Sequence, residues 1–229
     1  GMASVFKAYE PGLDRYVASL ADASLDSTSR DEQVAFWLNA YNAIVLQTVV
    51  HHYPIAPRTN QYPANSIRQV PGAFERIRHQ VAGRALTLDE IEQVVLPAFR
   101  DARVFLALGR GAVGGGRLRS EAYASDRLEH QLTEAANECV TRAQCFKFER
   151  ANRRVRVSSI FSWRRKEFIE GYADKSPGAF SRRSPIERAV LAFIAPGLLM
   201  AERQFLTGND FRVEYSAFDW SLNDLTGRT

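Results

Sequence analysis

DEQVAFWLNAYNAIVLQTVVH, residues 31–51, repeats apolar side chains every three to four positions. This spacing predicts a helix from about Asp31 to about His51. Ser29 and Glu32 form a capping-box pattern, in which each side chain satisfies a backbone amide of the first turn. The opposite face is also largely apolar, so we expect this helix to lie at the centre of the fold. The repeating positions are Val34, Trp37, Leu38, Tyr41, Ile44, Val45, Thr48 and Val49.

Further elements are predicted on both sides of a glycine-rich stretch, Gly109–Gly116. A second capping box at Thr87–Glu90 predicts a second helix. The continuous apolar run Val104–Leu108 is typical of a strand covered on both faces, and the glycine-rich stretch then forms a flexible or tightly turning loop. Helical periodicity over Asp126–Thr141 predicts a third helix. The apolar face of the second helix would consist of Leu88, Ile91, Val94 and Val95.

The C-terminal part of the chain predicts a small sheet. Phe146–Phe148 and Val155–Val157 alternate between apolar and polar residues and predict a β-hairpin, and Phe211–Tyr215 predicts a last strand. Between them, a serine cap followed by proline predicts a helix over Ser184–Ala195. The proline-rich Pro54–Pro71 has no clear periodicity and predicts a long connection.

We therefore expect a single α+β domain over residues 1–229, in which the central buried helix packs on a small sheet with a β-hairpin. No internal repeat and no low-complexity linker divides the chain. The inward positions of four elements should share one hydrophobic core. They are Trp37, Tyr41, Val45, Ile91, Phe105, Leu106 and Leu132.

Composition excludes several classes of protein. A hydrophobic content of 45% is ordinary for a protein with a core, and no apolar run reaches the length of a transmembrane span. The net charge is +4, but arginine strongly outnumbers lysine, which is typical of a GC-rich genome, and no nucleic-acid motif accompanies the basic clusters. Nucleic-acid binding is thus disfavoured against a solvated surface. Gly1 before Met2 is typical of an expression tag, so the compartment stays open between the cytoplasm and export with a removed signal peptide.

Cysteine and histidine form no pattern typical of a metal site. Cys139 and Cys145 lie six residues apart without a flanking histidine, so a disulfide and two buried thiols both stay open. The four histidines form no known ligand pair. His51 and His52 close the first helix, where positive charge meets the negative end of the helix dipole. We expect no metal and no cofactor.

Five segments together resemble the family known as domain of unknown function 547. The most specific is Phe36-Trp37-Leu38-Asn39-Ala40-Tyr41-Asn42-Ala43 in the first helix. The others follow in the family's order and extend over nearly the whole chain. They are Gly83–Glu92, Leu118–Tyr123, Ser158–Trp163 and Phe218–Asp224. The resemblance implies no settled activity.

The departures from this family concern four positions. Where similar proteins carry two histidines this chain has Gln93 and Phe105, and where they carry two cysteines it has Arg110 and Gly115. If relatives use these residues together, the four positions should converge on one cleft, whose chemistry this chain has lost. The alternative is that the relatives' cysteines form a structural disulfide and their histidines are core residues.

Further candidates for ligand binding surround the same segments. Asn39 and Asn42 share one helix face, where they would either orient a ligand or, as we favour, tie the helix to the proline-rich connection or a strand end. Glu92 would act as a general base or be an ordinary surface carboxylate. Arg119 and Tyr123 follow the glycine-rich loop, where the arginine would hold an anion or pair with Glu121. The glycine-rich loop does not end in Gly-Lys-Ser/Thr and does not open directly into a helix of a βαβ unit, so it matches neither type of phosphate-binding loop.

Three functions are compatible with these residues. The leading hypothesis is a non-catalytic domain that binds an unknown small molecule or peptide in a degenerate cleft. The first alternative is a metal-independent hydrolase or transferase with Glu92 or Asp219 as base and Arg110 supplying charge. The second is an interaction module that displays the Trp220 segment to a protein partner. The oligomeric state stays open.

Overall fold

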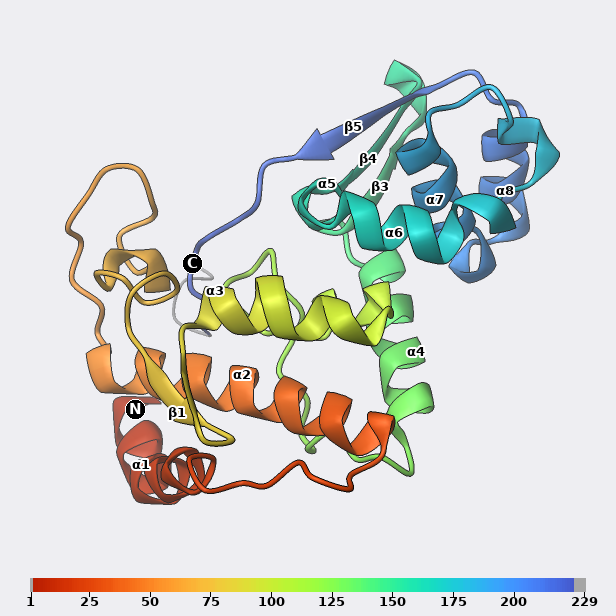
Figure 1. Cartoon of the computed structure of the whole chain (residues 1–229). Coiled ribbons are helices and arrows are strands. Elements are labelled where there is room, and N and C mark those ends of the chain that lie inside the picture. The colour runs from red at the N-terminus through yellow and green to blue at the C-terminus, as the bar shows by residue number, and fades with distance from the viewer. Residues whose placement is uncertain (1, 225–229) are drawn as a thin grey trace. The chain divides into compact units, whose positions relative to one another are not determined.

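Helices dominate the computed structural model, which describes the backbone of residues 2–224 and side chains from residue 11 onward (Figure 1). The described α-helices are α1 (Met2–Ser19), α2 (Arg30–His52), α3 (Leu88–Glu90), α4 (Leu128–Thr141), α5 (Ser159–Trp163), α6 (Arg165–Tyr172), α7 (Pro185–Ile194) and α8 (Met200–Thr207). The strands are β1 (His79–Val81), β2 (Arg84–Leu86), β3 (Phe146–Glu149), β4 (Arg154–Ser158) and β5 (Arg212–Ser216). The predicted α+β class is confirmed.

Packing divides the chain into two compact units. The first contains the chain up to Phe99, the segment Ala107–Gln131 and the described residues from Asp219 onward. The second contains Arg100–Leu106 and Leu132–Phe218. The single domain over the whole chain stays a prediction. All seven predicted core positions are buried, four of them in the first unit and three in the second.

The first unit is built around α2. The predicted capping box is confirmed, because Ser29 N donates to a Glu32 carboxylate oxygen at 2.7 Å and Glu32 N donates to Ser29 Oγ at 3.2 Å. Ten α2 side chains are buried, and the helix packs against α1 and α3 (Figure 1). Burial on so many faces is what the sparse polar surface of this helix predicted.

A second helical region follows the short β1–β2 hairpin. The Thr87–Glu90 capping box is confirmed, with hydrogen bonds of 2.8 and 3.0 Å. After α3 the chain continues as a π-helical turn over Ile91–Val95 and a 3-10 turn over Leu96–Phe99. This change of pitch rotates the side chains away from ideal α-helical positions. The prediction that Val94 faces the core is therefore wrong, since it is 64% exposed.

The predicted buried strand over Val104–Leu108 is wrong. Ala102–Phe105 form a 3-10 turn instead, Leu106 still has helical dihedral angles, and neither it nor Ala107 or Leu108 belongs to a described strand. Asp101 starts the turn, because its carboxylate accepts a hydrogen bond from Arg103 N at 3.0 Å. The run is buried as predicted, but a short continuous apolar run does not distinguish a buried strand from a buried helical turn.

The second unit contains a three-stranded sheet of order β3-β4-β5. The predicted hairpin is confirmed, with Phe146 opposite Val157, and Arg153 adopts a left-handed conformation at the turn. The predicted last strand is also confirmed, and it pairs parallel to β4. Parallel neighbours require a long crossover connection, here α5 to α8, within which α6 packs against α7 (Figure 1). Of the described helices, none combines the length and apolar character that a membrane crossing needs.

Cys139 and Cys145 form a disulfide between the end of α4 and the start of β3, with their Cα atoms 5.1 Å apart. We expect the double substitution Cys139→Ser/Cys145→Ser to lower the free energy of unfolding by about 2 kcal/mol, the loop-closure entropy of so short a loop. Urea denaturation under non-reducing conditions measures this loss. Reduction should destabilise the wild type by a similar amount and leave the variant unchanged; equal wild-type midpoints with and without reductant would contradict the prediction.

Candidate functional site

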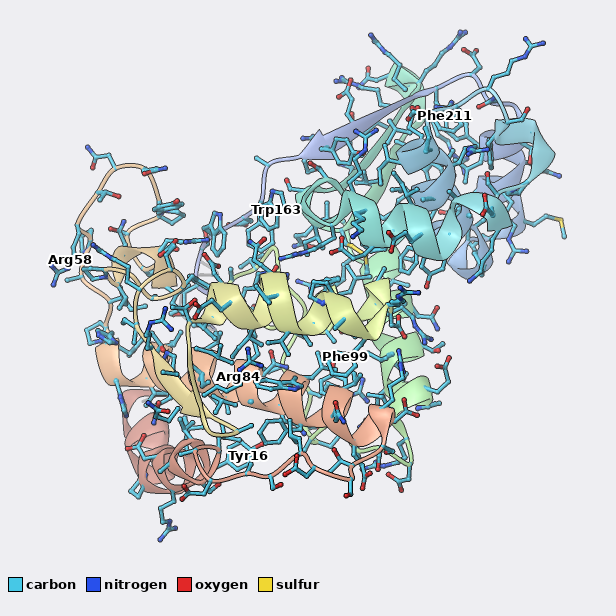
Figure 2. The ribbon with its side chains drawn as sticks, in the orientation of Figure 1. Tyr16, Arg58, Arg84, Phe99, Trp163 and Phe211 are labelled. Atoms are coloured by element: carbon cyan, nitrogen blue, oxygen red, sulfur yellow. A yellow bond between two sulfur atoms is a disulfide. The ribbon has the colours of Figure 1, made fainter. Side chains whose placement is uncertain are left out.

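A pocket of about 170 Å³ opens in the first unit between α1, α2 and the loop after the glycine-rich stretch. Four of its residues, Asn39, Asn42, Arg119 and Tyr123, are among those predicted from sequence. Tyr16 of α1 (labelled in Figure 2) also lines it, and burial raises the pKa of this phenol. The remaining lining residues are Leu118, Glu121 and Ala122.

The two asparagines of the pocket hold neighbouring backbone in place. Asn39 donates to Tyr123 O and accepts from Tyr123 N, both at 2.9 Å. Asn42 donates to Ala107 O at 3.2 Å and accepts from Gly109 N at 2.7 Å. The favoured structural role is thus supported. Their partners, however, are the glycine-rich loop and the segments on either side of it, and not the proline-rich connection.

Glu121 is the centre of a charged cluster at the pocket. Its carboxylate accepts from Gln131 Nε2 at 2.9 Å, from Arg119 Nη2 at 3.1 Å and from Arg127 Nη1 at 2.5 Å. The predicted Arg119–Glu121 ion pair is confirmed. The hydrogen bond from Gln131 and those from the two arginines lower the pKa of Glu121 to about 2.

This cluster predicts a specific pH dependence of stability. A carboxyl whose pKa is lower in the folded than in the unfolded state stabilises the fold above its unfolded pKa. Since the usual value is 4.5 and the folded value about 2, the contribution of Glu121 should disappear as the pH falls through this range. Urea unfolding of wild type and Glu121→Gln between pH 2 and 6 should give curves that converge towards the acid end. Curves that stay parallel would contradict this origin of the shift.

Gln131 fixes the loop from the other side. Its side chain donates to Ala122 O and accepts from Ala124 N, both at 2.9 Å, while it is almost completely buried. The backbone from Ala122 to Ala124 is therefore held by Asn39 on one side and Gln131 on the other. The pocket wall is preorganised by these contacts.

Glu92 and Arg110 form a buried ion pair outside the pocket lining. Arg110 donates to the two carboxylate oxygens at 2.6 and 3.2 Å, and Tyr41 Oη donates at 3.0 Å. All three residues are at most 7% exposed, and burial raises the pKa of Tyr41. Glu92 is thus not the ordinary surface carboxylate considered from sequence. Neither it nor Arg110 is among the residues that line the pocket.

The four positions at which the chain departs from its relatives are placed differently. A Cβ atom added to Gly115 would lie 3.5 Å from Arg110 Cβ, a separation that a disulfide spans. This proximity favours the disulfide alternative for the relatives' cysteines. Gln93 is exposed on the turn beside Glu92, and Phe105 is buried in the second unit beneath Arg164, whose guanidinium lies 4.4 Å from the ring. The convergence of all four positions stays a prediction.

The glycine-rich loop is occupied by the C-terminal segment of the chain. Val113 N donates to Ser221 O and Gly114 N donates to Asp219 O, both at 2.9 Å. Gly115 N and Gly116 N donate to carbonyl oxygens of the loop and its approach. These amides therefore donate to carbonyl oxygens of the chain itself and not to a bound phosphate, in agreement with the sequence, which has no phosphate-binding motif here.

The C-terminal aromatic residue Trp220 packs against other rings of the first unit. Trp220 is only partly exposed and contacts the rings of Tyr62 and Phe74, with centroids 6.2 and 5.7 Å away. The Arg68 guanidinium lies 4.4 Å from the Trp220 ring. The alternative in which the Trp220 segment is displayed to a partner stays a hypothesis. Asp219 is exposed, and its carboxylate accepts from Ser221 N at 2.9 Å.

No group of three metal-binding side chains comes together among the described residues. The expectation of no metal or cofactor stays a prediction. Elemental analysis of the purified protein tests it.

The fold and the site define an α+β protein with a small pocket in its first unit, whose wall is held by side-chain hydrogen bonds. The family model described as "Protein of unknown function, DUF547" matches residues 25–140, just over half of the chain, and the chain belongs to this family. The match includes the first-helix motif and the pocket residues on α2 and the following loop, and it ends before Ser158–Trp163 and Phe218–Asp224. No curated protein and no solved structure showed significant similarity to the chain.

Proposed function

We propose that this protein is a non-catalytic binding domain whose pocket takes a small molecule or a peptide end that carries a carboxylate. The observation that supports this is the meeting of Asn39, Asn42, Arg119 and Tyr123 around one pocket whose wall is fixed by hydrogen bonds. Preorganised polar groups in a concave site are typical of ligand binding, because less entropy is lost when a ligand arrives.

The size of the pocket limits the ligand. At about 170 Å³ it is smaller than the roughly 300 Å³ at which pockets for drug-sized molecules begin. It has room for about six water molecules at about 30 Å³ each. A short carboxylic acid or the C-terminal residue of a peptide fits this space.

The hydrogen-bond donors around the pocket favour an anion. Glu121 pairs with Arg119 and Arg127, and Asp126 lies 4.0 Å from Arg127 Nε, so the charges of this cluster balance. The carboxylate of Glu121 is already engaged by three donors, so it offers little to a cationic ligand. The guanidinium of Arg119 has a planar set of donors that matches a carboxylate.

The carboxylates of the chain argue against the hydrolase alternative. A general base works best with a pKa near the working pH, and the pKa of Glu121 lies near 2. Glu92 is buried in an ion pair, and Asp219 lies outside the pocket lining. These observations support binding over catalysis.

The test is a titration of the full chain with acetate, propionate and a short peptide, followed by two-dimensional NMR of the backbone amides. Shifts should concentrate on residues 118–124, and the amidated peptide should bind more weakly than the free acid. Arg119→Gln should weaken binding by about 10- to 100-fold, since a hydrogen bond to a charged group contributes about 1.5–3 kcal/mol.

Arg117→Gln is the matched control. It removes the same charge from the same loop, but Arg117 does not line the pocket, so affinity should change less than about threefold, a surface-charge effect. Equal losses in the two variants would indicate attraction by net charge alone. Shifts spread over the whole surface, or none at all, would reject the pocket as a binding site.

A further inference from the structure

The C-terminal segment Asp219–Asn223 lies along the glycine-rich loop of the first unit and is joined to it by backbone hydrogen bonds and one isolated β-bridge. Three backbone hydrogen bonds join them: Val113 N to Ser221 O, Gly114 N to Asp219 O, and Asn223 N to Gly111 O at 3.3 Å. Ala112 and Leu222 form an antiparallel bridge at the centre of this pairing. Backbone pairing of this kind is independent of side-chain identity, so it supplies affinity for any extended chain.

Side chains of the segment alternate, as expected for a strand. Leu222 is buried, and Trp220 contacts aromatic rings, whereas Asp219 and Asn223 are exposed. Two apolar anchors separated by one polar residue therefore contact the unit.

The anchor Trp220 contacts residues that are distant in sequence. Tyr62 and Phe74 approach its ring from the edge, and the guanidinium of Arg68 lies 4.4 Å from both the Trp220 and the Phe74 rings. Arg68 is held in turn by an ion pair with Glu75. We call Tyr62, Arg68, Phe74 and the backbone of Gly111–Gly114 the segment-binding surface.

The glycine-rich part of this surface rests on the central helix. Gly111 has a φ of +63°, and a Cβ atom there would meet Val49 at 3.2 Å and Val45 at 3.4 Å. A side chain at this position would push the loop off α2. Glycine therefore allows the loop to present its amides while it lies directly on the core.

We infer that the segment-binding surface is a peptide-binding site, which in this chain holds the chain's own residues 219–223. The external ligand is an extended peptide of another protein with the pattern aromatic, polar, aliphatic, matching Trp220, Ser221 and Leu222. It binds by adding a strand to the loop and by placing its aromatic residue against Arg68. The site shares no residue with the pocket of the proposed function.

Residues 219–223 of the chain compete with an external peptide for this site. The segment belongs to the same chain as the surface it binds, so its binding is intramolecular and competes with any separate peptide. A separate peptide of the same sequence therefore binds the wild type only in the fraction of molecules whose own segment has left. Substitutions that weaken the binding of residues 219–223 should therefore strengthen the binding of the separate peptide. If the segment were only a structural part of the fold, the same substitutions would give no such gain.

The experiment measures fluorescence anisotropy of a labelled peptide with the sequence of residues 217–224, titrated with the full chain. The variant Trp220→Ala/Leu222→Ala should bind it about tenfold or more tightly than the wild type, because its own segment competes less. Arg68→Gln in the same background should weaken binding a few-fold through loss of the cation–π contact. Arg58→Gln, which changes an exposed arginine of the same connection, should leave it unchanged.

Several outcomes would overturn the inference. Equal affinity of wild type and double variant would show that the segment is not a competitor. A peptide with alanine in place of its tryptophan that binds equally well would reject the aromatic anchor. If the wild type is a dimer in solution and the double variant is a monomer, the surface binds a second copy of this chain and not a peptide of another protein. If the double variant does not fold, as judged by circular dichroism, Trp220→Phe gives the same comparison with a smaller expected gain.

Discussion

Replacing Glu92 by glutamine is expected to lower the free energy of unfolding by about 3–5 kcal/mol, because Arg110 is left as an uncompensated buried charge. Arg110 is 1% exposed and donates two hydrogen bonds to this carboxylate. The glutamine side chain would keep one acceptor oxygen and the size of the original side chain, so the loss reports charge and not volume. Urea denaturation at neutral pH measures the change.

A matched double variant separates the ion pair from its surroundings. Glu92→Leu/Arg110→Met replaces both charges by apolar side chains of similar size, which for buried pairs is often neutral or stabilising. We expect it to recover most of the loss, except for about 1–2 kcal/mol from the Tyr41 hydroxyl, which loses its acceptor. A Glu92→Gln variant within about 1 kcal/mol of the wild type would mean that water reaches the pair and compensates the charge.

Gln69→Leu should destabilise the protein by about 3 kcal/mol, since it orphans several backbone groups of the proline-rich connection at once. Gln69 is 2% exposed, and its Oε1 accepts from Arg58 N and Thr59 N at 2.7 and 2.9 Å. Its Nε2 donates to the carbonyl oxygens of Thr59, Tyr62 and Pro63. One side chain thus makes five hydrogen bonds to a loop that lacks regular secondary structure at these positions.

The loss should be visible locally as well as globally. Hydrogen exchange of the Arg58 and Thr59 amides should accelerate in the variant before global unfolding, because their acceptor is gone. Gln61→Leu is the control, since Gln61 lies exposed in the same loop and its replacement should change stability by less than about 0.5 kcal/mol. Unchanged exchange at Arg58 would mean that water or neighbouring groups replace the Gln69 side chain.

Local signals in the sequence were sufficient wherever a few neighbouring residues determine the structure. The capping boxes at Ser29, Thr87 and Ser184 each mark a helix start that the structure confirms, because both partners lie within one turn. The hairpin was likewise predictable from alternation around a turn. The run Val104–Leu108 was not, since its composition fits two buried conformations equally well.

Features that depend on distant partners were missed or misplaced. Glu92 was considered a surface carboxylate because its partners Arg110 and Tyr41 are 18 and 51 residues away. The structural role of Gln69 was not predicted, since its five hydrogen bonds go to backbone groups, which have no sequence signature. Of the pocket residues, Asn39 and Asn42 were found from their spacing on a helix, whereas the contribution of Tyr16 required the packing of α1 on α2.

The first unit includes a segment from the end of the described chain, beginning at Asp219, and this has a consequence during synthesis. The amide of Val113 donates to Ser221 O, and that of Gly114 donates to Asp219 O. The ribosome must therefore add roughly a hundred residues, about 5–20 s at ordinary elongation rates, before these two hydrogen bonds can form in the nascent chain. For that interval the glycine-rich loop is an open edge, and a chaperone or a neighbouring nascent chain can reach it before Trp220 does.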